Sequence, residues 1–138
     1  MPEWTFRDYQ RPSTEGDESV LVNEILAWTL GLPTKAQAKI DMIILTLQAW
    51  VGPWPPQYVS DCGFEDIWEL RVKSGNVQYR PLGFYGPQRK VFTLVIGTIE
   101  KGGKIPKGDG ASAIERRRRV LKEGWPTCEH EFAEKAEE

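Results

Sequence analysis

Four basic residues in the middle of the chain are spaced so that they could meet at one phosphate group. Arg71 and Lys73 alternate with apolar residues, which places both side chains on the same face of a strand. Arg80 follows a short turn and Lys101 follows the next apolar stretch, so adjacent strands could bring these cations together. Lysine and arginine can together bind a phosphodiester, take a proton from a ribose 2′-OH and protonate the leaving oxygen. The four residues could therefore support RNA cleavage without a metal ion.

The two residue types suit different roles. Crowding of like charges lowers the pKa of a lysine, so Lys73 is the better candidate for the base, while the permanently charged Arg71 and Arg80 would hold the phosphate. A charged row that is simply solvated is the alternative interpretation of the same pattern. If these three residues lay on different surfaces, or were paired with Glu69 and Glu100, no such site would remain.

Charge is distributed unevenly along the chain. The formal net charge is −2 and the sequence pI is about 5.6, yet between Arg71 and Gly124 basic residues outnumber acidic ones by nine. The basic half could bind a polyanion through phosphate contacts, although solvated lysines and arginines would give the same composition. Arg116 to Arg119 are consecutive in a predicted helix and so spread around it, which favours solvation over a single basic patch.

The N-terminal third is expected to contain one strand and two helices. Trp4 to Tyr9 alternates apolar and polar residues as a half-buried strand does. After a polar break, apolar spacing predicts a helix from about Val20 to Gly31. Thr34 is expected to cap a second helix with one apolar face, formed by Ala36, Ile40, Ile43, Ile44, Leu47 and Trp50.

Three consecutive antiparallel strands are expected after the proline-rich loop that follows the second helix. Alternation and turn residues place them at 68–73, 77–85 and 91–99. The last of these is almost wholly apolar and should be the central strand. Pro81 cannot donate a ladder hydrogen bond, so we expect an edge position or a bulge there.

The chain is expected to end in a helix and a tail. Ser112-x-x-Glu115 has the spacing of a capping box and predicts a helix to about Lys122. We expect one domain over residues 1–124, followed by an acidic, mobile tail over residues 125–138.

Further expectations concern location and ligands. No segment is long and apolar enough for a membrane span or an export signal, so we expect a cytoplasmic protein without membrane contact. Cys62 and Cys128 are expected to be reduced and structural. His130 and Cys128 alone are too few for a metal site, so we expect neither a metal nor a cofactor.

The order of these elements and several segments match a known toxin family. The match runs from about Pro33 to Leu121. It includes Lys35 to Ile40, Trp68 to Gly75, Gln78-Tyr79-Arg80, and Val91 to Gly97 followed by Lys101, Lys104 and Pro106. In these respects the chain resembles the RelE/ParE toxin superfamily, closest to its HigB-like and phage-derived members.

The resemblance implies a fold and a function. The fold would be α+β, with a small antiparallel sheet, formed by an N-terminal strand and a three-stranded meander, packed against two N-terminal helices and followed by a short C-terminal helix. The function would be that of a type II toxin, a metal-independent, ribosome-dependent mRNA endoribonuclease (mRNA interferase) that inhibits translation. The partners would be the ribosome, mRNA and a cognate antitoxin, typically a helix-turn-helix protein.

With the resemblance included, eight residues are assigned to the site. The expected catalytic residues are Arg71, Lys73, Arg80 and Lys101. The expected RNA-binding residues are Tyr79, Tyr85, Arg89 and Lys104, with the tyrosines stacking on bases. Packing in the core is an equal alternative for both tyrosines.

Four positions depart from the family pattern. Ile96 stands where many relatives have His, Thr98 where they have Phe, and Glu100 where they have the first Lys of a pair. Glu69 stands where some members carry Lys. Glu100 and Ile96 favour an alternative function, that of a non-catalytic protein of the same fold that inhibits DNA gyrase or serves only as a phage-derived interaction protein.

Overall fold

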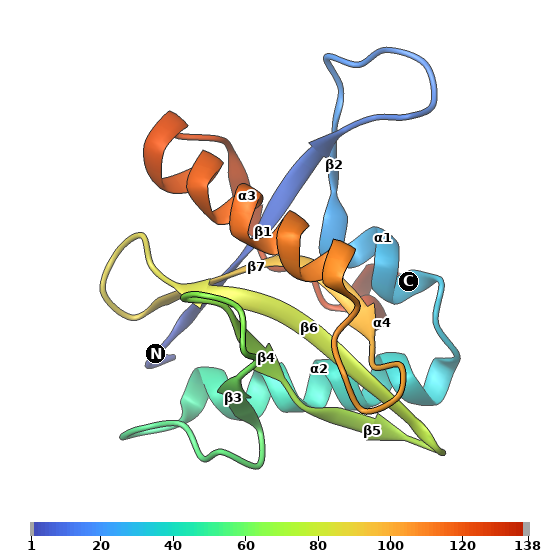
Figure 1. Ribbon diagram of the computed structural model, residues 1–138, viewed down its shortest axis with the longest axis vertical. Coiled ribbons are helices and arrows are strands. Elements are labelled where there is room, and N and C mark those ends of the chain that lie inside the picture. Colours follow the sequence, from blue (N-terminus) through green and yellow to red (C-terminus); the bar gives the residue numbers. More distant parts are fainter. Residues whose placement is uncertain (1, 137–138) are drawn as a thin grey trace.

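The computed structural model describes residues 2–136 and has an α+β fold (Figure 1). Its elements in chain order are β1 (Thr5–Pro12), β2 (Leu21–Asn23), α1 (Glu24–Leu30), α2 (Thr34–Ala49), β3 (Val59–Asp61), β4 (Trp68–Leu70), β5 (Val72–Ser74), β6 (Val77–Tyr85), β7 (Val91–Ile99), α3 (Lys107–Glu123), β8 (Thr127–Glu129) and α4 (Ala133–Ala136). These strands form one sheet in the order β2-β1-β7-β6-β4-β3, with β5 paired to β6 and β8 paired to β1. α3 crosses one face of the sheet, and α1 and α2 cover the other (Figure 1). None of the helices within residues 2–136 has both the length and the apolar character needed to span a bilayer.

The sheet is mixed, whereas an antiparallel sheet is expected from the sequence. β1 runs parallel to β7, with Phe6 beside Phe92, and antiparallel to β2 and β8. The expected three-stranded meander is confirmed. Its first strand is divided into β4 and β5, both of which pair antiparallel with β6, and β6 pairs antiparallel with β7. The three-residue strands β2, β3 and β8 escape prediction because three residues are too few to display a period of two.

The two N-terminal helices form where apolar periodicity predicts them, but their starts differ from expectation. The side chain of Asn23 accepts hydrogen bonds from the backbone N–H groups of Ile25 and Leu26, both at 3.0 Å, and so caps α1. The residues expected to begin this helix form β2 instead. The expectation that Thr34 caps α2 is wrong, because Thr34 is its first helical residue and Pro33 occupies the cap position.

Alternation in the central strands separates two cores on opposite faces of the sheet. Leu70 and Val72 lie in one core with Ile44 of α2. Leu82 lies in the other core with Val120 of α3. Burial of each such side chain contributes about 1.5–3 kcal/mol. Since neighbours along a strand point to opposite faces, the charged residues of β4 and β5 face the α3 side.

Pro81 lies inside the sheet rather than at its edge. β6 is paired on both sides, and opposite Pro81, which has no N–H to donate, the neighbouring strand is interrupted between β4 and β5. Arg71 at this gap is held from the other side, where its backbone N–H donates to the carbonyl oxygen of Tyr58 at 2.8 Å. β6 also shifts register against β7 between Leu82 and Gly83. The expected bulge is therefore found next to the proline, and the edge position is not.

α3 begins at Lys107, well before Ser112, the cap residue expected from the sequence. Gly108 and Gly110 lie in its first turns, and glycine is a poor helix former, so this segment resembles a loop. Packing explains Gly110, because a Cβ there would lie 2.2 Å from Cζ of Phe64. The early start brings Lys107 close to the charged face of the sheet.

Residues 125–136 pack against the beginning of the chain, although a mobile tail is expected here. β8 pairs with β1. Nδ1 of the buried His130 lies 2.9 Å from both carboxylate oxygens of Asp8, which has no exposed surface. Asp41 accepts hydrogen bonds from the first two backbone N–H groups of α4, each at 3.1 Å. Residues 137–138 of the expected tail lie outside the described residues.

Candidate functional site

The α3 side of the sheet carries three of the four residues expected to be catalytic. The strand register places Glu69, Arg71 and Lys73 on one face along β4 and β5. The same register sets Arg80 of β6 opposite Arg71, and on β7 Thr98 pairs with Arg80. Arg71, Lys73 and Arg80 therefore occupy adjacent positions on one surface, which we call the charged face.

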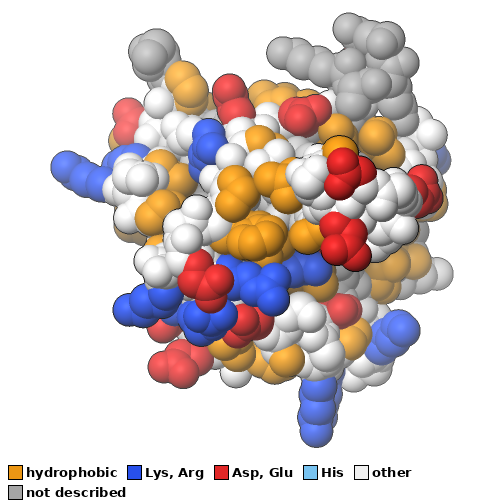
Figure 2. Space-filling model, turned by 90° about the horizontal axis from the view of Figure 1, so that it is seen from above, with side chains coloured by type: hydrophobic (Ala, Val, Ile, Leu, Met, Phe, Trp, Pro, Cys, Tyr) orange, Lys and Arg blue, Asp and Glu red, His pale blue; other side chains and the backbone are white. Residues whose placement is uncertain are grey.

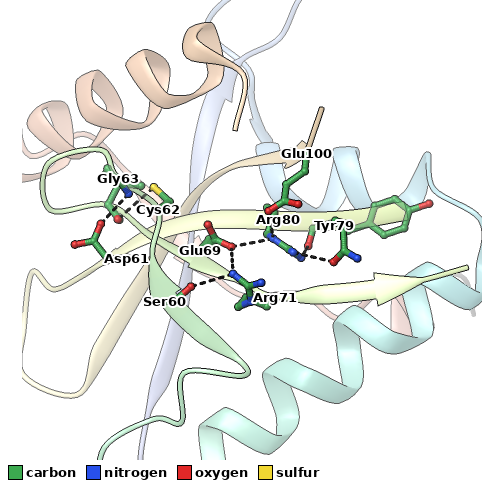
Figure 3. Close-up of polar contacts among 11 residues, drawn as sticks. Ser60, Asp61, Cys62, Gly63, Glu69, Arg71, Tyr79, Arg80 and Glu100 are labelled. Carbon is green, nitrogen blue, oxygen red and sulfur yellow. Dashed lines mark hydrogen bonds and ion pairs between the residues drawn. The ribbon is translucent and has the colours of Figure 1, made fainter. Parts of the chain in front are cut away.

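Arg80 is buried, and each nitrogen of its guanidinium has a partner within the protein (Figure 3). Its Nε lies 2.8 Å from Oε2 of Glu69 and 3.1 Å from Oε1 of Glu100. Its Nη1 donates to the carbonyl oxygen of Tyr79 at 3.0 Å, and its Nη2 donates to Oε1 of Gln78 at 2.8 Å. Only 1% of the residue is exposed. In this arrangement Arg80 does not present a nitrogen to a phosphate.

The expected role of Arg80 as a phosphate ligand is therefore corrected. Arg80 is paired with Glu69 and Glu100, and Arg71 is paired with Glu69, which is the arrangement stated above to leave no phosphate site of the expected kind. The physical reason for the correction is that the carboxylates of Glu69 and Glu100 contact the guanidinium of Arg80 away from water, where charge interactions are stronger than at the surface. Arg80 pairs with two acids, one of which also pairs with Arg71, and joins three neighbouring segments of the sheet.

Glu69 lies between two guanidinium groups. In addition to the contact with Arg80, its Oε2 lies 3.0 Å from Nη1 of Arg71. Burial raises the pKa of Glu69 above its usual value, the positive charges of Arg80 and Arg71 oppose this rise, and the negative charge of Glu100 adds to it. Within residues 2–136 no hydrogen bond or ion pair reaches Oε1 of Glu69. One oxygen of this acid is thus fixed and the other is unoccupied.

A pocket of about 300 Å³ opens over the charged face. Glu69 and Glu100 line it from the sheet, and Lys104 and Lys107 line it from the segment that leads into α3. Cys62, from the segment after β3, also contributes to the lining. The pocket therefore combines two acids held by a buried arginine with two exposed lysines.

The three exposed residues that were expected to be catalytic, Arg71, Lys73 and Lys101, lie outside the pocket lining. Lys73 is exposed on β5, and its carbonyl oxygen accepts a hydrogen bond from Nζ of Lys39 at 3.0 Å. Lys101 is exposed and pairs through its backbone with Lys104, which does line the pocket. The side chain of Arg71 is 42% exposed, so it can reach a ligand while it touches Glu69. Arg71, Lys101 and Lys104 are thus accessible cations beside the pocket.

The residues expected to bind RNA do not share one surface. Tyr79 is 5% exposed and packs in the α2-side core with its ring centroid 6.4 Å from that of Trp28, so it cannot stack on a base. Tyr85 lies at the opposite end of β6 within an aromatic cluster on the α2 side. Arg89 is exposed in the turn that follows. Of this expected set only Lys104 lines the pocket.

The consecutive arginines of α3 point in different directions, as the helical period predicts. Arg116 donates to Oε1 of Glu24 at 2.9 Å, and Arg119 donates to the hydroxyl oxygen of Tyr9 at 3.3 Å. The two arginines between them pair with nearby acids: Asp66, Glu115 and Glu123. Figure 2 shows the side of the molecule on which α3 lies, where basic side chains stand next to acidic and hydrophobic ones. These arginines do not form a separate polyanion site.

Packing accounts for the residues of β7 that depart from the family pattern. Ile96 belongs to the core beneath α3. The hydroxyl of Thr98 donates to a carboxylate oxygen of Asp109 and thereby anchors the first turn of α3 to the sheet. Glu100, which directly follows β7, binds Arg80. The three side chains serve contacts within the protein.

Of the residues that line the pocket, sequence reasoning assigns only Lys104 to the site, names Glu69 and Glu100 as departures from the family pattern, and gives Lys107 and Cys62 no role in a site. Lys107 was missed because the sequence predicts a helix that begins only at Ser112, which leaves Lys107 in a loop. The two lysines on either side of Pro106, Lys104 and Lys107, are the signal that could have indicated a basic site there. Cys62 donates its S–H to the carbonyl oxygen of Ile67 at 3.3 Å, and burial raises the pKa of its thiol. In the described part of the chain, no group of three or more His, Cys, Asp or Glu residues is placed to hold a metal ion.

Comparison with known proteins identifies the family of this chain. The family model described as Phage derived protein Gp49-like (DUF891) matches residues 27–118. This range covers most of the chain and includes the charged face and the pocket. No curated protein and no solved structure matches the chain. The chain therefore belongs to the Gp49-like family of phage-derived proteins, a family known for RelE-like toxins.

Proposed function

We propose that this chain is the toxin of a type II toxin-antitoxin pair and that it cleaves mRNA on the ribosome. The observation that carries the proposal is the pocket on the charged face, where the exposed Lys104 and Lys107 share the lining with the buried Glu69 and the partly buried Glu100. Membership of the Gp49-like family supports a toxin-like protein. The proposal goes beyond family membership in two respects, namely that the chain cleaves RNA and that it does so on the ribosome.

An RNA strand would enter the pocket through its phosphates. Lys104 and Lys107, which line the pocket, supply ammonium groups, and Arg71, which lies outside the lining and contacts Glu69, can hold two phosphate oxygens at once through its planar guanidinium. Lys73 and Lys101 adjoin these residues in the chain and extend the basic surface. Binding of this kind weakens steeply with salt, because phosphate contacts release counterions.

The proposed partners follow from this activity. The ribosome would present the message to the pocket in a fixed orientation, which lowers the entropic cost of bringing the reacting groups together. An antitoxin, proposed to be a helix-turn-helix protein, would keep the toxin inactive until it is needed. Co-expression of the protein encoded next to this one should then restore the growth of cells that produce the toxin.

Growth and mRNA mapping test the proposal. Production of the chain alone should stop bacterial growth and create new mRNA 5′ ends inside translated regions. Arg71→Ala combined with Lys104→Ala should reduce cleavage by about tenfold or more, since each removes an accessible charged contact to phosphate. Lys122→Ala removes an exposed cation from the far end of α3 and serves as the matched control. Intact messages with the parent chain, or parental cleavage by the double variant, would refute the proposal.

A second candidate is a non-catalytic protein of the same fold that inhibits DNA gyrase or only binds a partner. The observation that favours it is the pairing of Arg80 with Glu69 and Glu100, which neutralises the centre of the charged face. This candidate predicts intact mRNA in cells that produce the chain. A gyrase inhibitor would in addition induce the response to DNA damage.

A further inference from the structure

Glu69 meets the requirements of a general base better than the lysine expected from the sequence. Its Oε2 is fixed by Arg71 and Arg80, while its Oε1 has no partner within residues 2–136, and the carboxylate lines the pocket. Lys73 is exposed on β5 and does not line the pocket. A base is effective when it is held within hydrogen-bond reach of the proton that it takes. The pocket offers such a position for Glu69.

We propose that Glu69 is the general base that takes the proton from a ribose 2′-OH of RNA bound in the pocket. This inference rests on the cleavage activity proposed above. The 2′-oxygen forms a bond to phosphorus as Oε1 of Glu69 accepts its proton, and the bond from phosphorus to the 5′-oxygen breaks. The ammonium group of Lys104 or Lys107 gives a proton to the leaving 5′-oxygen. The products are a 2′,3′-cyclic phosphate and a 5′-hydroxyl, and exchange with water restores both side chains, so no proton is gained or lost overall.

The surroundings of Glu69 suit this role. Burial raises its pKa, so its proton affinity is closer to that needed near neutral pH than the affinity of an exposed carboxylate. The adjacent guanidinium of Arg71 can stabilise the charge that develops on the phosphoryl oxygens. The ionisable groups that face Glu69 from the elements around it are Cys62, Arg71, Arg80, Glu100, Lys104 and Lys107.

Arg80 is a positioning residue in this scheme. Its Nε lies 2.8 Å from Oε2 of Glu69 and sets the direction of the carboxylate, and its remaining nitrogens are bound to Tyr79 and Gln78. Glu100 shares the same Nε at 3.1 Å and places a second negative charge near Glu69. Neutralising Glu100 should therefore shift the pH dependence of cleavage through the pKa of Glu69, an effect that would not appear in the cleavage rate if Glu69 had a purely structural role.

Single-turnover cleavage on ribosomes tests the inference. The purified chain is mixed with ribosomes that translate a defined mRNA, and the cleavage rate is measured between about pH 5.5 and 8.5. The variants are Glu69→Gln, Glu69→Asp and Glu100→Gln. Glu65→Gln is the matched control, because it removes an exposed carboxylate from the segment just before β4 that does not line the pocket. Urea unfolding of each variant shows whether it is folded.

The inference predicts a specific pattern. Glu69→Gln should slow cleavage by about 100-fold or more and abolish the rise of the rate with pH. Glu69→Asp should recover part of the rate, and Glu100→Gln should move the midpoint of the pH profile to lower pH, since it removes a nearby negative charge. Glu65→Gln should behave like the parent.

Two results would overturn the inference in distinguishable ways. If the parent cleaves and folded Glu69→Gln cleaves at the same rate with the same pH profile, Glu69 is not the base and the proposed function stands. If the parent does not cleave any message on the ribosome, the proposed function and the inference fail together.

Discussion

Removal of the buried cation should destabilise the protein strongly. Arg80→Met keeps a flexible side chain of similar length but leaves Glu69 and Glu100 without the cation that they share. Glu69 retains Arg71, whereas Glu100 has no other ion pair among the described residues. The charge of at least one partly buried acid would then be uncompensated.

The expected magnitude follows from these contacts. Removing one partner of a buried ion pair costs about 3–5 kcal/mol, because the remaining charge stays in a medium of low polarity. Loss of the hydrogen bond from Arg80 to Gln78 adds about 1 kcal/mol. Since a domain of this size is stable by about 5–15 kcal/mol, Arg80→Met should lose a large share of its stability. Its melting temperature should fall by about 10 °C or more.

A compensated variant separates the effect of charge from that of packing. In the triple variant Glu69→Gln, Arg80→Met, Glu100→Gln, no ionised side chain of the cluster remains apart from the exposed Arg71. Replacing a whole buried ion-pair cluster by neutral groups of similar size is often neutral or stabilising. The triple variant should therefore be within about 1–2 kcal/mol of the parent.

Urea unfolding at pH 7, followed by circular dichroism, measures both variants. The reasoning is refuted if Arg80→Met loses less than about 1 kcal/mol, or if the triple variant is as unstable as the single one. The outcome also bears on toxicity assays. Loss of toxicity in an Arg80 variant would reflect unfolding as readily as lost chemistry, so it cannot by itself assign Arg80 a catalytic role.

Three further predictions concern stability. Gly110→Ala should lower the free energy of unfolding by about 1–3 kcal/mol, because its Cβ would overlap an aromatic ring. Gly108→Ala, whose Cβ meets open space in the same helix, should raise the free energy of unfolding by about 0.5 kcal/mol. Thermal unfolding of the two variants checks this difference. His130→Phe should lower the free energy of unfolding by about 3 kcal/mol, because the buried carboxylate of Asp8 would keep only Asn23 as a side-chain donor among the described residues. An unchanged midpoint of urea unfolding would contradict a stabilising contact between His130 and Asp8. Because burial raises the pKa of Glu69, the folded chain binds this proton more tightly than the unfolded chain. Stability should therefore fall as pH rises from about 4.3 through the raised pKa, and unfolding at pH 4.5 and 7 should show that Glu69→Gln lacks this contribution.

Local patterns predicted the centre of the fold well. The alternation around Leu70 and Val72 identified both the buried row and the charged row, because one face of the strand is packed against α2. The apolar run of β7 correctly indicated a central strand, since it is covered by helices on both faces. Pro81 was correctly linked to a bulge.

Contacts between distant parts of the chain could not be predicted in the same way. The parallel pairing of β1 with β7 joins residues that are more than 80 positions apart, and no local period encodes it. The start of α3 was missed because glycine is a poor helix former and therefore predicts a loop. Gly110 is nevertheless helical, and it is glycine because the ring of Phe64 leaves no room for a Cβ.

In the candidate site, too, local patterns were predicted correctly and contacts between distant segments were not. The strand period correctly placed Arg71, Lys73 and Arg80 on one face. The pairing of Arg80 with Glu100 depends on how β6 and β7 are aligned across the bulge, and this alignment is a tertiary property. The sequence raises the pairing with Glu69 and Glu100 as a possibility, but the burial of Arg80 depends on how these segments pack together, which the local pattern does not give.

The position of β1 has a consequence for synthesis of the chain. This strand is held by β2 soon after it is made, but β7 and β8 reach it only when residues beyond 90 and beyond 126 have been translated. A nascent chain would thus expose Phe6 and Tyr9, both buried in the folded protein, until these later strands have been made. Segments that are synthesised far apart in time must therefore meet before the core around β1 is closed.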